Sequence, residues 1–263
     1  MNVMTGDLAF IPLGGTGEIG MNLNVYRCDG ALLAVDCGLG FAGPDQPEAD
    51  VMVPDAAWLA EHRSSLQALI ITHAHEDHIG ALGHLWPLLK KSVYARKFTA
   101  SIGRLKFEEA GLPKDTIQVV AARPETIEAG PFKVQFVPVS HSIPESSALV
   151  IDTPAGRIFH TGDFKRDPSP IVGEGWDDAM MEEIAAERPV KALMCDSTNV
   201  FSTHAGRSES TLKGPLAEMI KGAGGMVVAT TFASNVARLK TLAEAGIAAD
   251  RSVCLLGRAM KRM

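Results

Sequence analysis

The sequence contains few cysteines, few aromatic residues and no excess of positive charge. Its 263 residues include four cysteines, none of them in a C-x-x-C pair, which fits reduced thiols in a cytosolic protein. No apolar run approaches the roughly 18 residues that a membrane span needs, and no basic segment followed by an apolar core opens the chain. We therefore expect a soluble, cytoplasmic protein without a membrane segment.

The charge balance argues against a generally basic nucleic-acid binder. The formal net charge is -6 at pH 7, so any contact with RNA has to depend on a local basic patch. The hydrophobic fraction of 46% is enough for one large domain, or for one domain and part of another.

The densest chemical feature of the chain is the motif THAHEDH. It places four side chains that can bind metals within six residues: His73, His75, Asp77 and His78. The preceding segment, residues 67–72, reads as a buried strand, and a helical pattern starts at Ile79. The motif therefore predicts metal ligands at a turn between a strand and a helix, whereas a histidine-rich surface loop would explain neither the Asp nor the strand.

The order H-x-H-x-D-H predicts two ions. His73 and His75 can point the same way and hold one ion, while Asp77 and His78 can reach a second one. Ions about 3.5–4 Å apart can together clamp a phosphoryl or acyl group and activate water. Further along, His141 and Asp163 each follow an apolar strand-like run, so we expect His141 to complete the first set and Asp163 to bridge the two ions.

The distribution of short apolar runs indicates a mixed α/β fold. Strands are predicted in the first third of the chain and again across a block from Thr116 to Phe159. Helices are predicted at residues 55–62, 79–89, 99–110 and 178–187. Sheets inside and helices outside are the expected arrangement.

Together these motifs resemble a known family. THAHEDH, PVSHSIPES, HTGDFK, MCDSTN and GRSES resemble the metallo-β-lactamase superfamily in its β-CASP nuclease branch, and most closely the ribonuclease J family. The likeness runs from Phe10 to Met260. It implies a four-layer αββα sandwich followed by the start of an inserted parallel α/β domain, the β-CASP domain.

The resemblance also implies roles for single residues. Asp36 is expected to orient the metal-binding loop through hydrogen bonds. Asp196 corresponds to an acidic residue beside the metals that is implicated in proton transfer to the leaving group, although the histidine that the family pairs with it lies beyond this sequence. The family's second ion takes another histidine from the same later region. Asp77, Asp163 and Asp196 are the expected catalytic carboxylates.

The implied function is metal-dependent hydrolysis of RNA phosphodiesters, as a 5′-exonuclease, an endonuclease or both. Two Zn²⁺ ions are the expected cofactors, with Mn²⁺ as the alternative because oxygen ligands share the second site. Single-stranded RNA with a 5′-monophosphate is the expected partner, and the full-length protein is expected to form a homo-oligomer. Two other interpretations remain open: a small-molecule hydrolase acting on thioesters or lactones, and a non-catalytic RNA-binding or assembly subunit.

The last fifty residues have a different pattern. A strand at residues 225–230, a helix carrying Val236, Leu239 and Leu242, and a strand at residues 252–256 predict a β-α-β unit. We expect a metallo-β-lactamase domain over residues 1–207 and the beginning of a β-CASP domain, apparently truncated, over residues 208–263.

The segment GTGEIG at residues 15–20 matches a dinucleotide-binding fingerprint. The residues that follow, from Met21 to Tyr26, alternate like a strand and offer no helix N-terminus for a pyrophosphate. We therefore expect a hairpin turn at these glycines.

Overall fold

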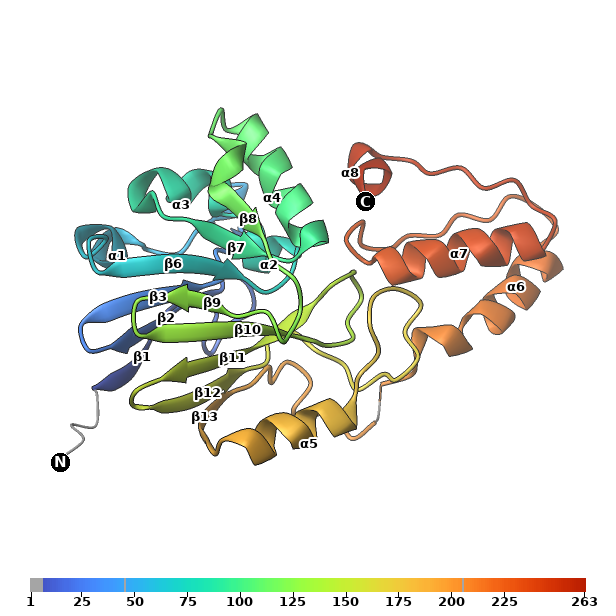
Figure 1. Ribbon diagram of the computed structural model, residues 1–263. Coiled ribbons are helices and arrows are strands. Elements are labelled where there is room, and N and C mark those ends of the chain that lie inside the picture. Colours follow the sequence, from blue (N-terminus) through green and yellow to red (C-terminus); the bar gives the residue numbers. More distant parts are fainter. Residues whose placement is uncertain (1–6, 45, 205) are drawn as a thin grey trace.

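The structure is a computed structural model that describes residues 7–44, 46–204 and 206–263. Two β-sheets pack face to face, and helices cover the outer face of each sheet (Figure 1). The first sheet has six strands, in the order β1 (Leu8–Gly14), β2 (Leu23–Cys28), β3 (Ala31–Val35), β6 (Leu66–Ile71), β7 (Val93–Ala95) and β8 (Ile117–Val119). The second sheet has five, in the order β13 (Val190–Met194), β12 (Gly156–His160), β11 (Ser147–Thr153), β10 (Phe132–Pro138) and β9 (Ile127–Ala129). The short strands β4 (Gly40–Phe41) and β5 (Val51–Met52) pair separately.

The helices fall into three groups. Those against the first sheet are α1 (Ala57–Glu61), α3 (Leu82–Leu89) and α4 (Lys97–Glu109), with α2 (Glu76–Ile79) and the 3-10 turn η1 (Lys114–Thr116) beside them. The second sheet is covered by α5 (Asp178–Glu187). The C-terminal part contains η2 (Glu209–Thr211), α6 (Lys213–Gly222), α7 (Val236–Ala248) and α8 (Arg258–Arg262). Among the described residues, no helix combines the length and the apolar character needed to cross a membrane.

Side-chain alternation along the strands builds the layers. In β3, Leu33 and Val35 pack between the two sheets together with Tyr26, whereas Leu32 and Ala34 face the helices of the first sheet. Successive side chains of a strand point to opposite faces, so a strand that is apolar on both sides is buried on both sides.

Three apolar clusters follow from this alternation. One lies between the helices and the first sheet, one between the two sheets, and one between the second sheet and α5, where Val150 packs with Ile184. Three buried interfaces require four layers. The predicted αββα sandwich is confirmed.

One predicted helix differs in the structure and another matches. The helix expected over residues 79–89 is divided into α2 and α3, because the Ala81 N–H donates to the Cys37 carbonyl and joins the break to the loop after β3. The helix predicted over residues 178–187 matches α5.

The predicted β-α-β unit is wrong in its strands. The helix forms as α7, but residues 225–232 and 251–256 flank it without strand pairing. Met226, Val228 and Leu256 are each more than three-quarters exposed, so much of the apolar surface of these segments is uncovered. Two parallel strands with bare faces are not stable, which accounts for the unpaired segments.

Candidate metal centre

The HxHxDH motif lies at the end of a buried central strand. β6 runs parallel between β3 and β7. The chain leaves the sheet at Thr72, passes His73 and His75, and enters α2 at Glu76, so that Asp77 and His78 lie in that helix. His73 is fully buried and His78 almost fully buried. Open α/β sheets place ligands at the carboxyl ends of such strands, and here the ends of β6, β10 and β12 converge.

Six predicted ligands form two overlapping groups. His73, His75, His141 and Asp163 offer ligand atoms within 4.8 Å of one another, and so do Asp77, His78 and Asp163. Asp163 belongs to both groups, and its two oxygens diverge. Oδ1 lies 3.2 Å from His78 Nε2, and Oδ2 lies 3.7 Å from His141 Nε2. This is the position expected of a bridging carboxylate.

The ring nitrogens of the first group converge on one point. His75 Nδ1 lies 3.2 Å from both His73 Nε2 and His141 Nε2. Nitrogens at this separation form ordinary hydrogen bonds only when one of each pair carries a proton. If all three present lone pairs, only a cation can satisfy them.

In His73, His75 and His78, the ring nitrogen that faces away from the proposed ions has a hydrogen-bond partner. His73 Nδ1 lies 3.0 Å from Thr72 Oγ1, and that hydroxyl donates its own proton to Asp36, so the ring N–H donates to it. His78 Nδ1 lies 2.7 Å from Asp36 Oδ2. His75 Nε2 lies 3.3 Å from Ser142 Oγ. Fixing the proton on the outer nitrogen leaves a lone pair on the inner one, which is how proteins prepare histidine for a metal. The residues therefore fit a pair of divalent cations.

The electrostatics divide the histidines into two kinds. Burial lowers the pKa of His73 and His75, and it lowers the pKa of His141 to about 3, with neighbouring imidazoles adding to the effect. Burial also lowers the pKa of His78, but the carboxylates of Asp36 and Asp163 outweigh it and raise that pKa well above the usual value. Three imidazoles are thus neutral at pH 7, and His78 is a cation when no metal is present.

Asp163 remains ionised throughout the neutral range. Burial alone would raise the pKa of its carboxyl, but His78, and then His141 and His75, bring it well below the usual range. A permanently charged carboxylate between the two ligand groups favours cation binding.

Asp36 connects the ligand loop to the neighbouring strand. It follows β3 with φ of 65°, a left-handed backbone that is uncommon for residues other than Gly, Asn and Asp. Its carboxylate accepts hydrogen bonds from the Thr72 N–H at 2.8 Å, from the Thr72 hydroxyl and from His78 Nδ1. Because Asp36 is fully buried, its carboxylate oxygens rely on these donors for their hydrogen bonds.

Replacing Asp36 with Asn is expected to weaken divalent-ion binding by about 10- to 100-fold without removing a ligand. Asn tolerates the left-handed backbone, but its amide cannot accept from both His78 and Thr72. Zinc affinity measured by competition with a chromophoric chelator checks this. Asp55→Asn, at an exposed turn where Asp55 caps the Ala57 N–H, is the matched control. Unchanged affinity in Asp36→Asn would show that Asp36 does not orient the site.

Asp196 lies beside the ligands without joining either group. It follows β13, its N–H donates to Thr161 Oγ1 at 2.9 Å, and its Oδ1 accepts from the Thr198 N–H. Together with Asp163, it lines both of the cavities that open at this end of the sandwich. Asp196 is therefore placed to contact a bound molecule.

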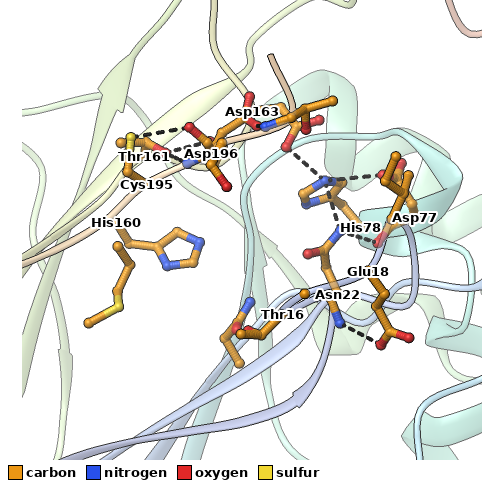
Figure 2. Close-up of a pocket in the computed structure, with 18 of the residues that line it drawn as sticks. Thr16, Glu18, Asn22, Asp77, His78, His160, Thr161, Asp163, Cys195 and Asp196 are labelled. Atoms are coloured by element: carbon orange, nitrogen blue, oxygen red, sulfur yellow. Dashed lines mark hydrogen bonds and ion pairs between the residues drawn. The ribbon is translucent and has the colours of Figure 1, made fainter. Parts of the chain in front are cut away.

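The first cavity, of about 700 Å³, runs between the two sheets' ends. His78, Asp77 and Asn22 lie on one side of it, and His160 and Asp196 on the other (Figure 2). The glycine-rich segment at residues 15–20 forms part of its rim and joins the antiparallel strands β1 and β2, so no helix follows it as a dinucleotide site requires. The second cavity, of about 520 Å³, lies between His141, Lys165 and the start of α7.

The remaining histidines lie apart from the ligand groups. His84 is exposed on α3, and His62 stacks on Trp58 beyond the end of α1. His204 is exposed at the rim of the second cavity. His160 is buried and hydrogen bonds to Tyr26.

Several residues that hold the site were not singled out from the sequence. Asn22 donates to the Asp77 carbonyl at 3.0 Å, and its Nδ2 lies 3.2 Å from His78 Nε2. Lys106 of α4 binds both carboxylate oxygens of Glu76, at 2.8 and 2.7 Å, and so anchors the start of α2. Thr72 and Ser142 complete the set. Each contact joins positions that are adjacent only in the folded chain, apart from that of Thr72 with His73.

Comparison with known proteins gives the class of this fold. The family model described as "Beta-lactamase superfamily domain" matches residues 33–210, more than half of the chain. The chain therefore belongs to the β-lactamase superfamily. A crystal structure described as a protein of unknown function from Enterococcus faecalis V583 superimposes with a TM-score of 0.61 at 20% identity, covering 90% of this chain and 63% of that one, which supports the fold.

Within that class the chain is similar to ribonuclease J. The family model "Ribonuclease J, beta-CASP domain" matches residues 224–263. The ribonuclease J of Sinorhizobium meliloti is 47% identical over 98% of this chain, and that of Mycolicibacterium smegmatis is 38% identical over 98%. The chain spans about half the length of these curated relatives, 46% of each. The predicted resemblance to ribonuclease J is confirmed.

Proposed function

We propose that this chain carries the metal centre of a metal-dependent ribonuclease that hydrolyses single-stranded RNA. The observation that carries the proposal is the convergence of His73, His75 and His141 on one point and of Asp77 and His78 on another, with Asp163 between them. The similarity to ribonuclease J supports RNA as the substrate. We also propose that residues 1–207 form the metallo-β-lactamase domain and residues 208–263 the start of the β-CASP domain.

The proposed roles follow from the donor set. His73, His75 and His141 would hold one Zn²⁺, Asp77 and His78 the second, and Asp163 both; oxygen ligands at the second site also suit Mn²⁺. When bound, the two ions supply the Lewis acid that activates water and neutralises charge developing on the phosphodiester. Asp36 and Thr72 fix the ring orientations of His78 and His73. Asp196 faces the cleft, where its carboxylate can exchange a proton with the leaving oxygen.

The second cavity is lined by two cationic side chains and also by the carboxylates of Asp163, Asp167, Asp196 and Glu209. Lys165 and Arg238 both line it, next to His141. Arg238 is paired with Glu209, and the Lys165 ammonium donates to the Arg207 carbonyl. A cation beside the ligands can bind an RNA phosphate, so we propose that single-stranded RNA enters on this side.

The test is a substrate panel on the zinc-loaded chain. A 5′-monophosphorylated RNA, the same RNA with a 5′-hydroxyl, and a model thioester are incubated separately, with Asp163→Asn as the control variant. The proposal expects at most weak RNA cleavage by this chain, which Asp163→Asn abolishes, and a preference for the 5′-monophosphate is the finer expectation. Thioester hydrolysis without RNA cleavage would point to a small-molecule hydrolase. RNA binding without any hydrolysis would point to an assembly subunit.

The charge state of His78 predicts how metal binding depends on pH. Its pKa is raised, so the imidazole is protonated at pH 7 in the metal-free protein and must lose the Nε2 proton to bind an ion. The three histidines of the first group have lowered pKa values and bind without losing a proton. Affinity for the second ion should therefore rise about tenfold per pH unit below the pKa of His78, while affinity for the first stays nearly flat near neutrality.

Isothermal titration in buffers of different ionisation enthalpy measures this difference. At pH 7, binding of the second ion should release one proton, and binding of the first ion should release none. Equal proton release at the two steps would mean that His78 is not a ligand, or is not charged in the metal-free site.

A further inference from the structure

The contact between His160 and Tyr26 shows which ring nitrogen of His160 carries the proton. The Tyr26 hydroxyl is buried, 1% exposed as a residue, and lies 2.8 Å from His160 Nδ1. Among the described residues this nitrogen is its one hydrogen-bond partner. A buried hydroxyl proton left without an acceptor is costly, so Tyr26 donates to Nδ1. The ring proton of neutral His160 is then on Nε2.

That Nε2–H points into the first cavity. Figure 2 shows His160 on the cavity wall, with the ring nitrogen farther from its backbone turned toward the side of His78 and Asn22. It has no partner among the residues described here, and it is not among the buried atoms that lack one. The donor is therefore open to a molecule in the cavity.

The surroundings select an anion. Asp163 and His78 of the ligand groups line the same cavity, and a substrate drawn there by two cations presents phosphodiester oxygens. His160 remains neutral because burial lowers its pKa to about 4, so it donates without adding a third positive charge. A fixed, neutral N–H facing a developing negative charge acts as the donors of an oxyanion hole do.

We propose that His160, with its tautomer set by Tyr26, donates a hydrogen bond from Nε2 to a phosphodiester oxygen of the bound RNA. This role rests on the proposed function, because it concerns the substrate of the same metal centre. No bond is broken by His160: it contacts the substrate and stabilises charge. Tyr26 acts through it as a positioning residue.

The tautomer can be tested without substrate. Nitrogen-15 NMR of the zinc-loaded protein should show His160 protonated at Nε2 and bare at Nδ1, and Tyr26→Phe should mix the two tautomers. A spectrum showing Nδ1–H in the parent protein would overturn the proposal.

Contact with the anion is tested separately, using dimethyl phosphate as the probe. It should shift the His160 Nε2–H resonance in the zinc-loaded protein and leave those of His62 and His84 unchanged. Absence of this shift at saturation would overturn the proposal even if RNA is cleaved. If RNA is not cleaved but the shift appears, the proposed function fails and the anion contact stands.

The effect on catalysis is measured with variants of matched shape. His160→Phe should lower kcat for RNA cleavage about 10- to 100-fold with zinc content unchanged, because only the donor is lost. His160→Gln, whose amide can place a donor near the Nε2 position, should recover most of the rate. His84→Phe is the control. Equal loss in His160→Phe and His160→Gln, or no loss in either, would contradict the proposal.

Discussion

Replacing His75 with alanine is expected to abolish firm zinc retention and, with it, the proposed RNA hydrolysis. His75 Nδ1 is the atom that lies 3.2 Å from both other imidazoles of the first group, so its removal opens the centre of the donor set. Losing a hydrogen-bond partner of a ligand already costs about 10- to 100-fold in metal affinity, and losing the ligand itself should cost at least roughly hundredfold. Zinc per chain after dialysis, measured by elemental analysis, gives the result.

The matched control is His84→Ala. His84 is exposed on α3, close in sequence and outside both ligand groups, so its removal should leave zinc content unchanged. Equal zinc loss in the two variants would mean that the ligand set is misassigned.

Gly38→Ala is expected to have the second large effect, on stability and on the metal centre together. A Cβ at this position would lie 1.6 Å from the Asp77 carbonyl oxygen and 2.9 Å from the Asn22 N–H nitrogen. Both obstacles are backbone, and Gly38 and Asn22 are tied by an N–H to carbonyl bond of 2.9 Å, so neither side can yield cheaply. We expect a loss of about 3 kcal/mol, or a decrease in Tm of about 6–12 °C.

Because Asp77 moves with that backbone, Gly38→Ala should also weaken the second metal site more than the first. Thermal unfolding and zinc titration of the same sample measure both effects. Gly222→Ala, at a position where a Cβ meets nothing within 4 Å, controls for the substitution itself. A Gly38→Ala protein with the parent's Tm and two intact sites would show that the three backbone segments do not constrain one another.

The sequence predicted those parts of the site that are local. His73, His75, Asp77 and His78 fall within six residues after an apolar strand, and their chemistry is visible without knowing the fold. His141 and Asp163 were found because each follows a strand, and strands that share an edge deliver their ends to one place.

The partners that orient these ligands depend on tertiary structure instead. Asp36 meets His78 across 42 residues, and Ser142 meets His75 across 67. Such contacts depend on strand order and register, and periodicity does not fix either. Asp36 was expected to orient the loop only through the family resemblance, and Asn22 had no assigned role although its segment carries part of that resemblance.

At residues 225–230 and 252–256 the sequence predicted strands that the structure does not form. Their local pattern is that of buried strands, yet Met226 is 90% exposed and the segments stay unpaired. Strand propensity becomes structure only where a sheet or helix covers the apolar face. The four-layer sandwich was expected from the family resemblance, and its central strands β3 and β6 do find such cover.

Anomalous X-ray diffraction at the zinc edge, on crystals grown with zinc, tests the central claim most directly. We predict two peaks. One should lie about 2.0–2.1 Å from His73 Nε2, His75 Nδ1 and His141 Nε2, and the other should be bound by Asp77 and His78, with Asp163 reaching both. Peaks bound elsewhere, or a single peak instead of two, would contradict the two-ion centre.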